Sequence, residues 1–235
     1  MPTTRWDVEL PIAAELPALP RGIVLHWTGG GRTANSADLG AYHFVVEHDA
    51  TVRRGRWPVG ANMRQVGGDD YAIHTGGFNS FRVGISAAGM KDYVSREQPG
   101  HCPLTEVQVR RMAEVAAYFL ALAALDPLDP RRLCTHREVW TLHSIKGKQN
   151  HLKRDIEFLP FRPDLGRDEV GDFLRGLAAA ATPPTVHPID SDLRPAIPVI
   201  VPDVVEVRVP TPSPSPVLAA GETSWWGRLL ERIRR

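Results

Sequence analysis

Gly22-Ile-Val-Leu-His-Trp27 predicts a short buried strand, because the run is apolar and is closed by the turn-forming stretch Thr28-Gly-Gly-Gly-Arg32. Outward from it, residues 82–87 predict a second strand. Residues 132–135 predict a third, which ends at His136. Two of the three predicted strands therefore end at a histidine, and the first of them leads into a glycine-rich turn.

Hairpin and helix signals alternate with these strands. Residues 43–47 and 51–56 predict a hairpin, and Thr105 is a plausible N-cap for a long helix. Residues 168–181 predict a last helix. The apolar face expected for the long helix consists of Val109, Met112, Val115, Ala116 and Phe119. Strands and helices that interleave predict an α/β fold, with helices packed against a mixed central sheet.

Proline marks the end of the predicted domain. Ten of the 21 prolines lie between residues 183 and 216, and such a segment favours an extended, semi-rigid spacer. We therefore expect a single domain over residues 1–181, a Pro-rich linker over 182–217 and a short tail over 218–235. The apolar pieces at 197–201 and 204–209 are an alternative, since they are suited to docking on the domain as edge strands.

Bulk composition excludes several classes of protein. The net charge of +1 gives no general drive toward nucleic acid, and two cysteines are too few for a disulfide scaffold. The apolar run at 116–125 is too short for a membrane span. The first ten residues lack the pattern of a secretory signal, so we expect synthesis in the cytoplasm.

Three residues carry the donor atoms that a catalytic zinc ion prefers. His26 and His136 stand at predicted strand ends, and Asp155 lies between a polar loop and an apolar run. Zinc in catalytic sites takes three such protein ligands and keeps one position open for water. No local spacing joins the three residues, so their chemistry alone gives only a weak indication of a metal site.

Six ordered blocks resemble the N-acetylmuramoyl-L-alanine amidases, the zinc enzymes shared by phage endolysins and peptidoglycan recognition proteins. The resemblance covers residues 20 to 162. The blocks are Val24-Leu-His-Trp-Thr28, Tyr42-His-Phe-Val-Val46, Ile73-His-Thr-Gly-Gly-Phe-Asn79, Val83-Gly-Ile85, Thr135-His-Arg-Glu-Val139 and Lys153-Arg-Asp155. The resemblance implies a hydrolase that cuts the amide between N-acetylmuramic acid and L-alanine in bacterial peptidoglycan.

The same resemblance implies a role for each matching residue. The zinc ligands would be His26, His136 and Asp155; zinc lowers the pKa of its bound water toward about 7. Tyr42 would lie beside that water, and the Lys153 ammonium would face the oxyanion. We expect Lys153 and Asp155 to leave the same face of an extended segment.

The resemblance also implies two residues of the substrate groove, and the chain departs from the family pattern at one position. His74 and Asn79 match positions that line the substrate groove. Many members carry a glutamate after the Gly-Ile of the fourth block, where this chain has Ser86. A serine is not a base at neutral pH, so that role passes to Tyr42 or to metal-bound hydroxide.

Other residues have competing interpretations. Cys134 is two residues before His136, but we expect a buried core cysteine rather than a metal ligand. His43 should face away from Tyr42 and serve the structure, and His48 should be a turn residue. Solvated side chains are expected for His143 and His151, and either is the alternative third ligand.

The tail contains a possible amphipathic helix. Trp226, Leu229, Leu230 and Ile233 follow a helical spacing, with arginines largely elsewhere in residues 224–235. Such a segment suits an anionic membrane surface, and the equal alternative is docking on the domain or a partner.

Taken together, these features predict a monomeric phage-type endolysin that acts in bacteriolysis, on the cell wall, after release from the cytoplasm. A cytosolic amidase that recycles wall fragments is the alternative enzyme. A module that binds peptidoglycan without cutting it is the alternative from another class.

Overall fold

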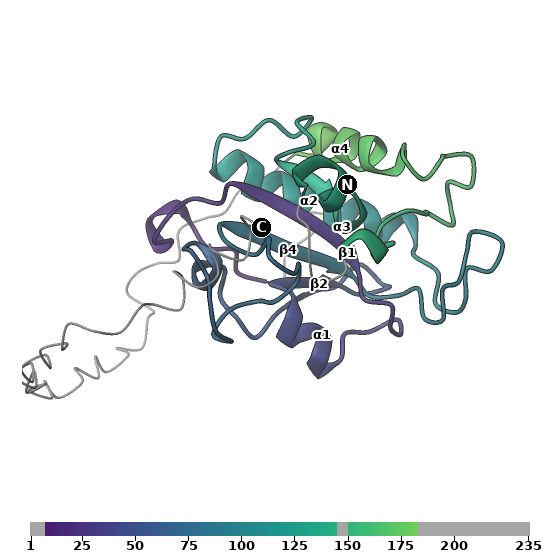
Figure 1. The fold of residues 1–235 in the computed structure, drawn as a ribbon, viewed down its shortest axis with the longest axis horizontal. Helices are drawn as coiled ribbons and strands as arrows, with labels where there is room; N and C mark the ends of the chain where they lie inside the picture. Colours follow the sequence, from purple (N-terminus) through teal and green to yellow (C-terminus); the bar gives the residue numbers. More distant parts are fainter. Residues whose placement is uncertain (1–7, 145–149, 183–235) are drawn as a thin grey trace, which may run out of the picture. The chain divides into compact units, whose positions relative to one another are not determined.

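A five-stranded sheet forms the centre of the protein (Figure 1). The computed structural model describes residues 8–144 and 150–182. The strands are β1 (Gly22–Trp27), β2 (Phe44–Val46), β3 (Val52–Arg54), β4 (Arg82–Ala87) and β5 (Leu133–Thr135). Their order across the sheet is β3-β2-β4-β1-β5. The strands predicted at 22–27 and 82–87 are confirmed at both ends.

The sheet is mixed, as the sequence predicted. β1 pairs in parallel with β4 on one side and with β5 on the other, and β2 pairs in parallel with β4. β3 runs antiparallel to β2, which confirms the predicted hairpin at the sheet edge. In the β1–β4 register His26 stands directly beside Ser86, so the serine that replaces the family's glutamate adjoins the predicted metal site.

Helices cover the sheet and connect its strands. They are α1 (Ser36–Ala41), α2 (Glu106–Leu122), α3 (His136–His143) and α4 (Val170–Ala180), with short 3₁₀ turns η1 (Ala13–Glu15), η2 (Val59–Asn62) and η3 (Asn150–Leu152). α2 begins after its predicted cap, since the Thr105 side chain accepts a hydrogen bond from the Gln108 backbone. All five residues of its predicted apolar face are buried. α4 confirms the predicted last helix to within two residues at each end.

Successive side chains of β1 point to opposite faces of the sheet and pack in two different clusters. Ile23, Leu25 and Trp27 pack in the main core, to which α2 and α4 contribute. Val24 belongs instead to a small cluster with Cys134 and Val139. His26 is fully buried and shares the side of the sheet on which Val24 lies, so the histidine is directed away from α2.

Two helices were not predicted, and one expectation about His136 was wrong. β5 ends at Thr135, and His136 is the first residue of α3 rather than the close of a strand. The Thr135 side chain caps α3 by accepting from the Glu138 backbone. Asn35 caps α1 in the same manner, by accepting from the backbone of Asp38.

Within the described ranges, no helix has both the length and the apolar character needed to cross a membrane. The predicted linker over 182–217 and the tail over 218–235 lie outside the described residues, apart from residue 182 itself.

Candidate metal centre

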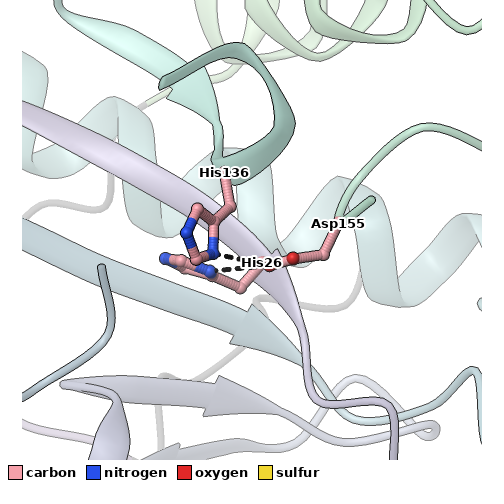
Figure 2. Close-up of side chains that lie close together, drawn as sticks. All are labelled: His26, His136 and Asp155. Atoms are coloured by element: carbon pink, nitrogen blue, oxygen red, sulfur yellow. Dashed lines mark hydrogen bonds and ion pairs between the residues drawn. The ribbon is translucent and has the colours of Figure 1, made fainter. Parts of the chain in front are cut away.

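Three buried side chains converge from separate parts of the fold (Figure 2). His26 comes from the end of β1, His136 from the first turn of α3, and Asp155 from the coil that follows η3. Nδ1 of His26 lies 2.8 Å from Oδ2 of Asp155, and Nδ1 of His136 lies 3.2 Å from the same oxygen. All three candidate ligand atoms lie within 4.8 Å of one another.

This spacing fits a divalent metal. With ligand bonds of about 2.0–2.2 Å in tetrahedral geometry, two donor atoms lie roughly 3.4 Å apart. The observed separations of 2.8 and 3.2 Å need to open by only a fraction of an ångström. Two imidazoles and one carboxylate also match the donor set of a catalytic zinc site, which keeps a fourth position for water or substrate.

Protonation in the cluster also suits a metal. Burial lowers the pKa of His26 to about 4, so its ring is neutral at pH 7 and has a free lone pair. Burial alone would raise the pKa of Asp155, but hydrogen bonds to His136 and His26 hold it well below its usual range. Neutral imidazoles and an ionised carboxylate are the forms that bind metal.

Hydrogen bonds behind the cluster reach the outer nitrogens of both imidazoles. Nε2 of His136 lies 3.1 Å from Oδ1 of Asn150, and the Asn150 amide nitrogen donates to the Gly76 carbonyl oxygen at 2.8 Å. Nε2 of His26 lies 3.4 Å from the Thr75 hydroxyl oxygen. The loop containing Thr75 and Gly76 therefore supports both rings.

The two predicted catalytic residues differ in their surroundings. The ring centroid of Tyr42 lies 5.0 Å from that of His26, so this residue is beside the cluster. Burial raises the pKa of Tyr42, so its hydroxyl stays protonated and can donate, which does not suit the role of base that was one of its two expected roles. Lys153 is exposed, and its charge acts with burial to lower the pKa of His26.

Lys153 does not lie in the extended segment that was expected. Its backbone N–H donates to the Asn150 carbonyl at the end of η3, and Asp155 begins a turn. A shared strand face therefore does not explain how Lys153 and Asp155 are placed. Ser86 is fully buried beside His26 and brings no carboxylate to the cluster.

The family model for N-acetylmuramoyl-L-alanine amidases matches residues 16–150, more than half of the chain. The chain belongs to this amidase family. The match includes β1, Tyr42, the loop at 73–79 and the start of α3, which are four of the regions from which the resemblance was drawn.

Solved structures with some similarity to the chain include other amidases. The amidase LysC from Clostridium intestinale URNW is 19% identical, with 56% of this chain and 81% of that one covered at a TM-score of 0.36. A complex of the peptidoglycan recognition proteins LCa and LCx with tracheal cytotoxin gives 19% identity, 57% and 81% coverage and a TM-score of 0.35. The Ph2119 endolysin from Thermus scotoductus MAT2119 bacteriophage Ph2119 gives 19% identity, 52% and 73% coverage and a TM-score of 0.31. No curated protein sequence matches the chain.

The predicted groove residues of this amidase are buried. His74 is 6% exposed and Asn79 is 3% exposed. The Asn79 side chain accepts from the Thr75 backbone at 2.7 Å, and Nδ1 of His74 lies 2.9 Å from the Thr75 hydroxyl oxygen. Nε2 of His74 is buried, and no side chain or backbone group of the described residues is within hydrogen-bond geometry of it. Both side chains therefore support the loop behind the metal cluster, and contact with substrate stays a prediction.

The structure keeps the other candidate ligands out of the cluster. Cys134 is buried in the apolar group with Val24, and burial raises the pKa of its thiol to about 12. His43 has the expected structural role, with Nε2 3.0 Å from the Asn62 amide oxygen and Nδ1 accepting from the backbone of residue 84. His143 was expected to be solvated, but it is partly buried against the Phe78 ring; His151 is exposed, as expected.

Sequence reasoning missed the polar residues that hold the site. Asn62 ties the loop together by donating to the carbonyls of Ala72 and Asn79, while Asn150 and Thr75 reach the imidazoles. Thr75 stands inside a recognised block and was open to assignment. Asn62 and Asn150 carried no local signal, because their partners are distant in the sequence.

Proposed function

We propose that this amidase hydrolyses the bond between N-acetylmuramic acid and L-alanine in peptidoglycan, with one zinc ion held by His26, His136 and Asp155. The observation that carries the proposal is the convergence of these three buried ligand atoms in a chain of this family. A bound zinc ion would polarise the amide carbonyl and activate a water molecule.

The chain's own residues supply the remaining requirements of amide hydrolysis. Developing negative charge on the carbonyl oxygen needs a preorganised cation or donor, and the departing nitrogen needs a proton. Lys153 is exposed, and its positive charge is close enough to add to the effect of burial in lowering the pKa of His26. Tyr42 keeps its proton, since burial raises its pKa, and its ring lies against His26. We assign oxyanion stabilisation to Lys153 and hydrogen-bond donation to Tyr42.

A complete ligand set favours an enzyme over a module that only binds the wall. All three ligand positions are filled by residues of the right chemistry and are buried together. Burying polar groups costs free energy unless they are paired or coordinate a metal, and a bound metal would offset that cost here. The proline-rich linker and the tryptophan- and arginine-rich tail favour a phage-type endolysin, released to the cell wall, over a cytosolic recycling enzyme.

Digestion of purified peptidoglycan tests the reaction class. The amidase should release stem peptides that begin with a new N-terminal alanine, and it should create no new reducing sugar ends. Zinc removal with a chelator should abolish the release, and zinc alone should restore it. New reducing ends, or release that persists without metal, would contradict the proposed reaction.

A further inference from the structure

Asn150 is a buried side chain that joins His136 to a loop 74 residues away in the sequence. Its amide oxygen lies 3.1 Å from Nε2 of His136, and its amide nitrogen donates to the Gly76 carbonyl oxygen at 2.8 Å. Asn150 is 1% exposed, so water does not compete for either contact.

The contact with the Gly76 carbonyl fixes which atom of Asn150 donates and which accepts. A carbonyl oxygen only accepts, so the Asn150 amide nitrogen must face Gly76. The Asn150 amide oxygen then faces His136 and accepts, which requires the hydrogen on Nε2 of that ring. With the Nε2 hydrogen fixed in this way, a ring that gives up the Nδ1 hydrogen it shares with Asp155 at 3.2 Å is neutral and has its lone pair on Nδ1.

We propose that Asn150 is a positioning residue that holds His136 in the tautomer able to bind metal through Nδ1. The inference rests on the proposed zinc function and deepens it. Without the amide, the ring hydrogen is free to move to Nδ1, and the ring is free to turn about its χ2 angle. Either change removes a ligand atom from the cluster, so Asn150 sets the metal affinity without touching the metal.

The bond from Asn150 to Gly76 connects His136 to the loop behind the site. In that loop, Thr75 has a hydroxyl oxygen 3.4 Å from Nε2 of His26 and a backbone N–H bonded to Asn79. The loop held by Asn79 therefore contacts the outer side of one imidazole directly, and reaches the other through Asn150.

Zinc affinity of the full chain, measured by competition with a chromophoric chelator, tests this role. Asn150→Leu keeps the side-chain size but removes both contacts, and should weaken zinc binding by about 10–100-fold. Asn150→Asp keeps an acceptor for Nε2 of His136, while its second oxygen loses the bond to Gly76 and faces that carbonyl, so its zinc affinity should stay near that of the wild type if the contact with His136 is what matters. Gln108→Leu is the matched control. Gln108 is a fully buried amide on α2 that donates to two backbone carbonyls at 2.8 Å each.

The four proteins separate the possible outcomes. Weak binding by Asn150→Leu, with near-normal binding by Asn150→Asp and Gln108→Leu, supports the tautomer role. Equal losses in both Asn150 variants would overturn it, because the bond to Gly76 would then be what matters. Normal binding by Asn150→Leu would also overturn it. A wild-type chain that binds no zinc would overturn the proposed function, and this inference with it.

Discussion

At the scale of single residues, the proposed roles separate metal binding from chemistry. His26, His136 and Asp155 are buried and contact one another, whereas Lys153 is exposed beside them. Buried ligands are held in one geometry by their neighbours, and an exposed lysine is free to meet a substrate. Substitution of the three buried residues should therefore lower zinc content, whereas substitution of Lys153 should lower turnover alone.

Lys153→Ala and Tyr42→Phe should keep stoichiometric zinc and a normal fold but lose turnover. Loss of one donor to a developing oxyanion typically lowers the rate by about 10²–10³-fold, and we expect this magnitude for Lys153. Peptidoglycan release rates and zinc content would be measured on the same samples. His151→Ala, an exposed residue two positions before Lys153, is the control and should stay active. Full activity in Lys153→Ala would remove the oxyanion role.

At the scale of elements, an ion-pair cluster fixes the Asp155 segment against α3. Glu157 is 4% exposed; it accepts from the Tyr93 hydroxyl at 3.1 Å and pairs with Arg154 at 2.6 Å and Arg137 at 3.5 Å. The Arg137 backbone N–H donates to the Asp155 carbonyl oxygen at 2.7 Å. Arg137, which follows His136, is thus bonded both to Asp155 and to Glu157.

Glu157→Gln should therefore lower the free energy of unfolding. The change removes the charge of a buried acceptor that pairs with two arginines, a loss of about 1–3 kcal/mol. Glu106→Gln is the control, because the Glu106–Arg110 pair is exposed and such pairs contribute about 0.5 kcal/mol or less. Urea unfolding of both variants without metal gives the comparison. Equal stability of the two variants would show that the Glu157 contacts contribute no more than a surface pair.

Strands of this fold were predictable from the sequence, but two helices and the outer contacts of the site were not. β1 is an apolar run followed by turn residues, and β4 alternates Val83 and Ile85 with small or polar residues. α1 and α3 have only six and eight residues, too short to show helical periodicity, although both carry a polar cap with an acidic residue three positions later. Asn150 was invisible because its two partners lie 14 and 74 residues away, and only the folded chain brings them together.

At the scale of the whole molecule, the domain predicted over 1–181 is proposed to carry all of the catalysis. The tail at 224–235, outside the described residues, is proposed to bind anionic membrane. A spacer of about 35 proline-rich residues at about 3.1 Å each reaches on the order of 100 Å if fully extended. That length would let the tail engage a membrane while the domain works on the wall.

A chain shortened to end near residue 181 should cut naked peptidoglycan as fast as the full chain but bind anionic vesicles less. Co-sedimentation at low and high salt would measure the binding, since attraction through exposed arginines is screened beyond about 8–10 Å at physiological ionic strength. Equal vesicle binding by the two chains would mean that the tail does not engage membrane.

Zinc content of the purified full chain, compared with its Asp155→Ala variant, tests the central claim most directly. We predict one zinc per wild-type chain and none in the variant, because the variant leaves two imidazoles where a catalytic site needs three ligands. Circular dichroism would show that both chains are folded. Stoichiometric zinc in Asp155→Ala would contradict the proposed ligand set and would make His143 or His151 the candidate third ligand. A folded wild-type chain without zinc would contradict the metal centre itself.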